Sequence, residues 1–224
     1  VTYLQLETDY YTKSSAEAMA KYVRTSECLQ RIDWNTNEMV NYMLTENERF
    51  QQAEDMFCCF LPAFQESTSL KNLHIELPDR AGASRRDIAG GPSNLALKNM
   101  LTHTQSLRSL SLICPDGLPG EAIALAAAWS GLKKNTTLRE LTLVSSGATT
   151  VSPIFTSLCE HPLLRRLCLR GHAMQLDGLV DVLLSSNSHI TELFIQRLYG
   201  GFSTTGLTPV LQALARRPTL TMLG

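Results

Sequence analysis

Cysteine and histidine are the side chains of this sequence that could serve as a nucleophile and its base. Cys168 lies in the strand-like segment RLCL, and His74 lies at the equivalent place in the segment NLHI. A thiolate nucleophile needs its base within hydrogen-bond reach. The repeat described below separates the two segments by three strands, or roughly 14 Å at about 4.8 Å per strand. The chain also lacks the H-E-x-x-H and G-x-S-x-G motifs, so we expect that it is not an enzyme. The other histidines are His103, His161, His172 and His189.

The segment 79–92, DRAGASRRDIAGGP, combines glycines with arginines, as a phosphate-binding loop could. Such a loop places its glycines between a strand and a helix and follows them with Lys and Ser or Thr in fixed register. Gly90-Gly91-Pro92-Ser93 precedes an expected helix, but no G-K-[ST] follows it. We therefore expect no cofactor, and we assign the segment to a loop at the rim of the molecule that could touch a partner.

The cysteine spacing gives no sign of a metal site or of a disulfide framework. There is no C-x-x-C, and the adjacent Cys58 and Cys59 would point to different sides of a helix. Reduced cysteines behave as small buried apolar residues and are typical of a reducing compartment. We expect free thiols and no bound metal. The remaining cysteines are Cys28, Cys114, Cys159 and Cys168.

Three segments with the same apolar spacing define a repeat. They are Leu138-x-x-Leu141-x-Leu143, Leu164-x-x-Leu167-x-Leu169 and Ile190-x-x-Leu193-x-Ile195, and their first members lie 26 residues apart. A period of this size is the signature of a stacked solenoid. The pattern can be traced outward to give a single domain, 1–224, of about seven repeats. Their strands start near residues 1, 29, 70, 107, 138, 164 and 190, with a truncated eighth at 220.

The fullest copy of the pattern L-x-x-L-x-L-x-x-N-x-L is Leu29-x-x-Ile32-x-Trp34-x-x-Asn37-x-Met39. On these residues the chain resembles the leucine-rich repeat family, and within it the ribonuclease-inhibitor-like kind. The resemblance implies an α/β solenoid, a horseshoe with a parallel β-sheet on the concave face and helices on the convex face. The Asn of the pattern is kept only at Asn37, so we expect irregular loops after the other strands. The chain opens and ends within the repeat, and we expect a monomeric fragment of a longer solenoid.

Helix-like segments connect the strands. In the segment 50–64 a broad face carries aromatic residues, which we assign to core packing, and Pro62 is expected to kink or end this helix. This repeat carries an insertion of about a dozen residues within 37–69, since its neighbouring strand sets lie 41 residues apart. The other expected helices cover 14–28, 93–104, 121–132 and 206–217, and Leu158 and Leu183 mark two more.

Composition narrows the class of partner. The chain has 224 residues, 44% of them hydrophobic, and a net charge of −1, which is too balanced for an obligate polyanion binder. Residues 1–69 hold 11 acids and 5 bases, whereas residues 70–224 hold 10 acids and 15 bases. No apolar run reaches the roughly 18 residues of a membrane helix. The segment VTYLQLETDYY lacks the features of a signal peptide, and we expect a cytoplasmic protein that binds no membrane.

Alternate residues of a strand face opposite sides, so the residues between the apolar positions face solvent on the concave side. They mix aromatic, polar and both kinds of charged side chain, which suits a folded protein partner more than a polyanion or a lipid surface. Trp34 occupies a leucine position and is assigned to the core. The predicted partner-binding residues are Asp33, His74, Glu140, Arg166, Cys168, Arg170, Glu192, Phe194 and Gln196.

These observations favour a scaffold for protein–protein recognition, expected to be the recognition part of a larger intracellular receptor or adaptor. Two alternatives stay open. The resemblance also allows a ribonuclease-inhibitor-like or GTPase-activating regulator of one dedicated partner. The basic half, 70–224, allows a polyanion binder, whose affinity would fall steeply with salt; nucleic acid is the less favoured ligand. The sequence does not name the partner.

Overall fold

The computed structural model describes residues 1–7, 12–35, 46–76, 92–114, 129–145, 152–171, 176, 178–186, 188–197, 204–217 and 220–222. Strands and helices alternate along this part of the chain. The first half holds β1 (Tyr3–Glu7), α1 (Lys13–Thr25), β2 (Arg31–Asn35), α2 (Glu46–Glu66), β3 (Asn72–Glu76), α4 (Pro92–His103) and β4 (Ser109–Cys114). The second half holds the 3₁₀ helix η1 (Leu132–Lys134), β5 (Glu140–Ser145), α6 (Ser152–Leu158), β6 (Arg166–Gly171), α7 (Leu179–Leu184), β7 (Glu192–Arg197), α8 (Thr204–Ala215) and β8 (Thr221–Met222).

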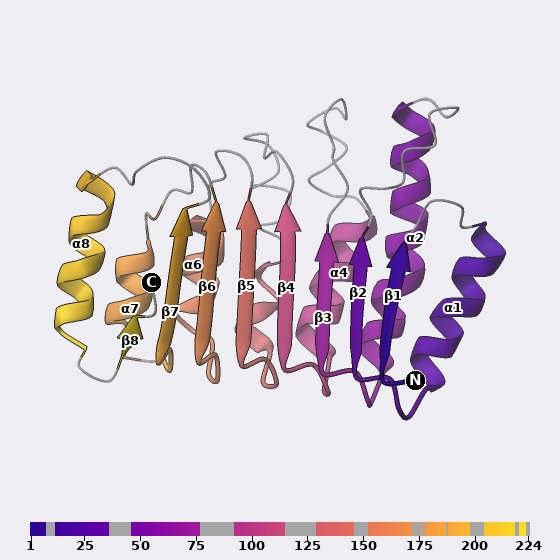
Figure 1. Ribbon diagram of the computed structural model, residues 1–224, viewed down its shortest axis with the longest axis horizontal. Coiled ribbons are helices and arrows are strands. Elements are labelled where there is room, and N and C mark those ends of the chain that lie inside the picture. Colours follow the sequence, from indigo (N-terminus) through magenta and orange to yellow (C-terminus); the bar gives the residue numbers. More distant parts are fainter. Residues whose placement is uncertain are drawn as a thin grey trace.

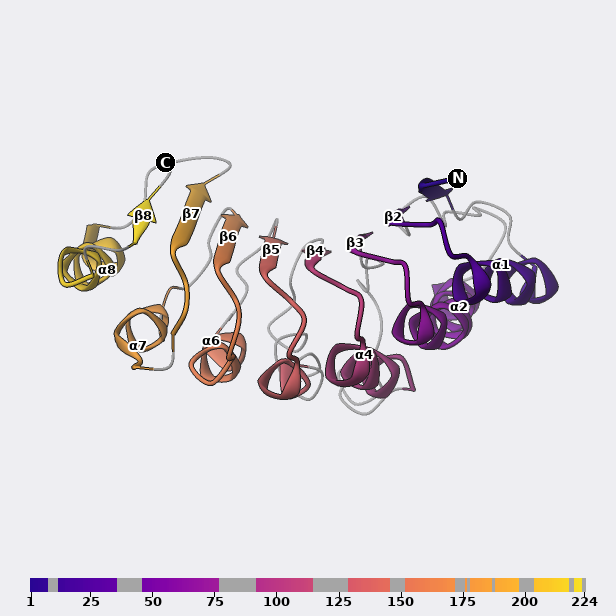
Figure 2. The same cartoon turned by 90° about the horizontal axis from the view of Figure 1, so that it is seen from below.

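The eight strands form one sheet in chain order, and every neighbouring pair is parallel. Figure 1 shows the strands side by side with no crossover between them. In Figure 2 the strands line the inner side of an open arc and the helices lie along its outer side. A stack in which each unit touches only its neighbours is solenoid-like. The expected α/β class, with a parallel sheet and one outer layer of helices, is therefore confirmed.

The apolar positions of the repeat form two continuous buried rows behind the sheet. Leu141 pairs with Leu167 and Leu143 with Leu169, and the same positions pair along the other strands. Leu110, Leu141 and Leu167 are each fully buried. Because side chains alternate along a strand, burial of these rows forces the intervening residues onto the inner face.

A repeated backbone arrangement fixes this register at the start of β2 to β7. The carbonyl of Arg108 accepts hydrogen bonds from the backbone N–H groups of Arg139 (2.8 Å) and Glu140 (3.0 Å). The carbonyl of Arg139 accepts from Arg165 (2.8 Å) and Arg166 (3.0 Å) in the same way. One carbonyl thus binds two N–H groups of the following strand. The carbonyls of Thr2, Gln30, Lys71 and Arg165 repeat the arrangement.

The turn that leads from the outer layer into a strand is held by a buried polar side chain. Asn135, three residues before Leu138, accepts hydrogen bonds at Oδ1 from the N–H groups of Thr137 (3.0 Å) and Leu138 (2.7 Å). One repeat later His161 accepts at Nδ1 from the N–H groups of Leu163 (3.2 Å) and Leu164 (3.1 Å). The two residues are different in kind but satisfy the same two backbone donors.

Helix α2 packs its aromatic face on Trp34. The Trp34 ring centroid lies 4.6 Å from that of Phe57, 5.1 Å from that of Phe60 and 5.8 Å from that of Phe64. Trp34 and Phe60 are fully buried, and the assignment of Trp34 to the core is confirmed. Pro62 does not end this helix, because α2 continues to Glu66, and the alternative expectation of a kink stays a prediction. Leu61, Ala63 and Phe64 are buried on either side of it, and this packing offsets the cost of about 3 kcal/mol that an internal proline carries.

The other helices begin and end within three residues of their expected bounds where the structure describes them. Most of the helix expected over 121–132 falls outside the described residues, which resume at Trp129 and form η1. Asn37 and residues 79–91 of the arginine-bearing segment also lie outside them, so neither expectation is tested. No helix in the described part of the chain has both the length and the hydropathy needed to cross a membrane.

We predict that Trp34→Ala lowers the free energy of unfolding by about 3–5 kcal/mol, the usual cost of removing a large buried aromatic side chain. Trp34→Phe should cost less than half as much, because it keeps a ring and because the buried Nε1 of Trp34 has no hydrogen-bond partner to lose. Denaturant unfolding followed by circular dichroism measures both. A cost below about 1 kcal/mol for the alanine variant would show that the ring does not organise the core.

Candidate functional site

Three rows of side chains run across the inner face of the sheet. The middle row is Gln5, Asp33, His74, Ser111, Thr142, Cys168 and Phe194, each paired in register with the next. The row nearer the start of the strands is Tyr3, Arg31, Asn72, Ser109, Glu140, Arg166 and Glu192, and the row nearer their ends includes Asn35, Glu76, Ile113, Val144, Arg170 and Gln196. The structure therefore brings the predicted partner-binding residues together on one face.

An ion-pair cluster occupies β1 and β2. The Arg31 guanidinium donates from Nε to Asp33 Oδ1 (3.0 Å) and from Nη2 to Asp33 Oδ2 (2.8 Å). The Tyr3 hydroxyl donates to Asp33 Oδ2 (3.1 Å), and the Arg31 guanidinium lies 5.5 Å from the centroid of the Tyr3 ring. Burial raises the pKa of Asp33, but the Arg31 hydrogen bonds and charge, helped by Tyr3 and His74, outweigh it and hold the pKa below its usual value. This end of the face presents a fixed carboxylate.

A second cluster, on β6 and β7, joins a cation to an aromatic ring. The Arg166 guanidinium lies 4.6 Å from the centroid of the Phe194 ring, and Arg166 Nε lies 3.5 Å from Glu192 Oε2. In the next row Arg170 and Gln196 stand opposite each other, and both are exposed. Arginine over an aromatic ring is an attractive contact in water and stronger once desolvated. This end of the face therefore offers an aromatic surface with a positioned charge.

Cys168 departs from the expectation that it faces a partner. Its side chain is 7% exposed, so it is buried although it belongs to the middle row. In register it lies between Thr142 and Phe194, and the larger aromatic side chain stands beside the small thiol. Cys168 is therefore not part of the exposed surface, whereas Glu140 is exposed and His74 is half-buried.

Short side chains separate the two clusters. Ser109 and Ser111 on β4, Thr142 and Val144 on β5, and Ile113 are all half-buried. Neither charge nor a large ring projects from the middle row over these two strands. In the middle row a partner would therefore meet only short side chains over β4 and β5, with the exposed Glu140 of β5 in the neighbouring row.

The structure does not bring His74 and Cys168 together as a base and its nucleophile. His74 and Cys168 stand in the same row but three strands apart. Burial raises the pKa values of Cys58, Cys59 and Cys159, which keeps these thiols protonated and poorly nucleophilic. Across the described part of the chain, no three His, Cys, Asp or Glu side chains are placed to hold a metal ion.

His161 has a structural role in the turn rather than a chemical role toward a ligand. It is 1% exposed, and its Nδ1 is used by the two N–H groups of the turn. Burial, with Arg139 and His189 nearby, lowers its pKa to about 4. The imidazole is therefore neutral at neutral pH and is not available to exchange protons with a ligand.

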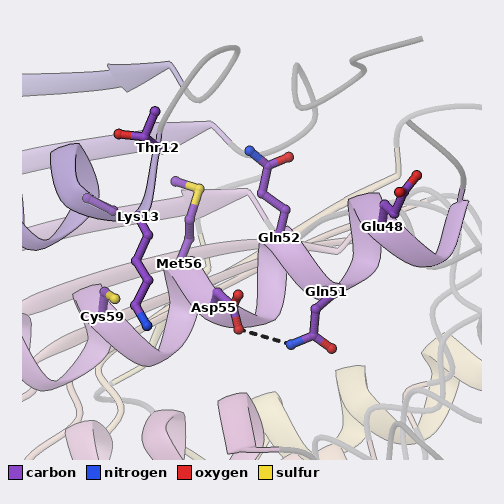
Figure 3. A pocket seen from close by; sticks show the side chains of 9 residues that line it. Thr12, Lys13, Glu48, Gln51, Gln52, Asp55, Met56 and Cys59 are labelled. Carbon is purple, nitrogen blue, oxygen red and sulfur yellow. Dashed lines mark hydrogen bonds between the residues drawn. The ribbon is translucent and has the colours of Figure 1, made fainter. Parts of the chain in front are cut away.

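A pocket of about 310 Å³ lies between α1 and α2, on the outer side of the sheet (Figure 3). Lys13, Gln51, Asp55 and Cys59 are among its lining residues, and Gln51 Nε2 donates to Asp55 Oδ1 (2.9 Å). This hydrogen bond joins two of the polar side chains that line the pocket to each other. Sequence reasoning missed this pocket because its walls come from two helices that no shared motif connects.

A comparison with models of known protein families finds none that matches the chain, and a comparison with curated proteins finds no match either. Function must be argued from the surface, because one fold can serve many functions.

We predict that His161→Asn keeps the stability of the parent at pH 7 and removes part of its loss in acid. Asparagine accepts the same two N–H groups at position 135. Folded His161 has a pKa of about 4 and an unfolded histidine titrates near 6.5. The unfolded state therefore binds more protons between these values, and the parent loses about 3 kcal/mol as the pH falls through them.

Denaturant unfolding between pH 8 and pH 4 measures this difference. His161→Ala is the matched comparison, because it leaves both N–H groups without an acceptor and should be less stable than His161→Asn at every pH. Equal pH slopes for the parent and His161→Asn would contradict the structural part given to His161.

We also predict that Arg31→Ala raises the pKa of Asp33, because the guanidinium supplies the two hydrogen bonds and the charge that favour the carboxylate. Carboxyl carbon chemical shifts followed against pH report the titration of Asp33 directly. Tyr3→Phe, which removes one weaker hydrogen bond, should raise it less. An Asp33 pKa that stays the same in Arg31→Ala would mean that the ion pair does not form in solution.

Proposed function

We propose that this protein is a recognition module that binds a protein partner through the inner face of its sheet. The observation that carries the proposal is the cluster of Arg166, Phe194 and Glu192 beside Arg170 and Gln196, held in register on β6 and β7. Arginine and aromatic residues are the types that most often dominate the binding energy of protein interfaces. Phe194 is only half-buried, so part of its ring is open to a partner.

The distribution of charge on this face supports a folded protein as the ligand. A fixed carboxylate at Asp33 stands near one end and the cations Arg166 and Arg170 stand near the other. A polyanion would be repelled at the first end, and a lipid surface would require a flat apolar patch. Complementary charges on a protein partner would set its orientation across the strands.

We further propose that the fold is a leucine-rich repeat horseshoe of the ribonuclease-inhibitor-like kind. The apolar pattern L-x-x-L-x-L coincides with β2 to β7, the strands follow chain order, and the helices lie on the outer side. Each of these features supports the proposal without being unique to that family.

We also propose that the module belongs to a larger receptor or adaptor in the cytoplasm. The support for a reducing compartment is that Cys28, Cys58, Cys59, Cys159 and Cys168 are free thiols. In such a protein the inner face would bind the partner, and other parts of the protein would respond to that binding.

We predict that a triple variant, Arg166→Ala, Arg170→Ala and Phe194→Ala, loses the partner that the parent captures. Removing the ring and both guanidinium groups takes away the side chains expected to contribute most of the binding energy. A loss of about tenfold or more in affinity is therefore expected. Affinity capture with the immobilised parent, followed by titration of the captured protein onto parent and variant, measures the difference.

A control variant makes the same kinds of change on the outer side. Lys21→Ala, Lys98→Ala and Leu211→Ala remove two cations and one apolar side chain, all exposed, from α1, α4 and α8. It should bind as the parent does. Equal binding by the parent and the inner-face variant would contradict the proposed function, provided both variants unfold at the same temperature as the parent.

A further inference from the structure

A row of four cations runs along the edge where the strands begin. Lys71, Arg108, Arg139 and Arg165 each stand one residue before β3, β4, β5 and β6, and we call this row the basic edge. The N–H of Arg108 donates to the Lys71 carbonyl, that of Arg139 to the Arg108 carbonyl, and that of Arg165 to the Arg139 carbonyl, each at 2.8 Å. At about 4.8 Å per strand the row spans roughly 14 Å. In Figure 1 this is the edge at which the arrows begin.

In the part of the chain that the structure describes, the basic edge lacks acidic partners. Lys71, Arg108 and Arg165 are exposed and Arg139 is half-buried. Within the described residues no carboxylate pairs with any of the four, and the ion pairs nearby use other cations, Lys133 with Glu160 and Arg166 with Glu192. Like charges in line on neighbouring strands repel one another. The fold keeps an unfavourable arrangement that a bound anion would relieve.

Two of the three guanidinium groups in the basic edge are already positioned. Arg108 Nη1 donates to the Thr137 carbonyl (3.0 Å), and Arg139 Nη1 donates to the same carbonyl (3.1 Å). A guanidinium carries five N–H donors, so both groups keep donors for a ligand. Burial, followed by the charges of Arg108 and Arg165, lowers the pKa of Arg139. The like charges are therefore close enough to affect one another. Because the hydrogen bonds to the Thr137 carbonyl already hold two of the guanidinium groups, less side-chain entropy is lost when an anion binds.

We propose that the basic edge binds a short acidic peptide segment that crosses β3 to β6. Arginine forks match carboxylates with two parallel hydrogen bonds. The neighbouring positions along the edge, Gln30 before β2 and Thr191 before β7, carry no charge. The site thus ends after four strands, which fits a segment of a few acidic residues.

A nucleic acid fits this edge less well. Binding of single strands relies on aromatic side chains that stack on bases, and none stands in the row from Gln30 to Thr191. A long polyanion would also continue past β3 toward residues 1–69, which hold 11 acids and 5 bases. The acidic peptide is therefore the ligand that the charges of this surface favour.

Binding of fluorescein-labelled hexaglutamate to the whole chain tests the proposal by fluorescence anisotropy at low and at physiological salt. The variant Lys71→Ala with Arg165→Ala removes two cations whose side chains make no hydrogen bond to a described residue, so its fold should be kept. We expect it to bind about tenfold more weakly than the parent. The control, Lys21→Ala with Lys98→Ala, removes the same charge from α1 and α4 and should bind within about twofold of the parent.

Three results would overturn the proposal. The first is a parent that does not bind hexaglutamate at low salt, and the second is an equal loss in both double variants. The third is a short DNA duplex that binds more tightly than the peptide and depends on the same two cations, which would assign the basic edge to nucleic acid. The inner-face triple variant, with the basic edge intact, should still bind the peptide, so this test and that of the proposed function fail separately.

Discussion

One backbone arrangement determines most of this structure. At the start of β2 to β7 a single carbonyl of the preceding unit accepts two N–H groups, from that of Thr2 on through that of Arg165. This contact involves no side chain, so it holds units of unequal length in one register. The strands of the longest unit, β2 and β3, are separated by α2 and residues outside the described part, yet they pair position by position as β5 and β6 do. The greater chain length between β2 and β3 therefore leaves their pairing in the sheet unaltered.

A fixed register has two consequences for function. On the inner face it aligns residues that are unrelated in sequence, so that Arg166 meets Phe194 and Glu192, and Arg31 and Tyr3 meet Asp33. At the edge it aligns residues of the same charge, so that Lys71, Arg108, Arg139 and Arg165 stand in line. The first alignment makes a surface of mixed charge and aromatic character, and the second makes a surface of uniformly positive charge. The two surfaces suit different ligands although the same hydrogen bonds create both.

The sequence predicted the strands well, because leucines at fixed spacing must be buried and so determine which side of each strand faces the core. It also placed Asp33, Arg166 and Phe194 on one side. It could not predict that Cys168 is buried, because the exposure of a short side chain depends on its neighbour in register, which is the Phe194 ring on the next strand. The continuation of α2 through Pro62 depends on packing against Trp34, a tertiary contact that helix propensity of the local sequence does not predict. The equivalence of Asn135 and His161 has no signal in residue type and emerges only from the backbone groups they bind.

The central claim is that the strands form one in-register parallel stack, and amide hydrogen exchange of the intact chain tests it most directly. Exchange slows where hydrogen bonds open only by cooperative unfolding. The account predicts that the amides of β3 to β6 exchange slowest and together, including those of Arg139 and Arg165, which bond to the carbonyl of the preceding unit. The amides of β1 and β8, at the two ends of the sheet, should exchange faster. Exchange of β4 or β5 at the rate of the terminal strands would contradict the stack, and with it both surfaces that depend on its register.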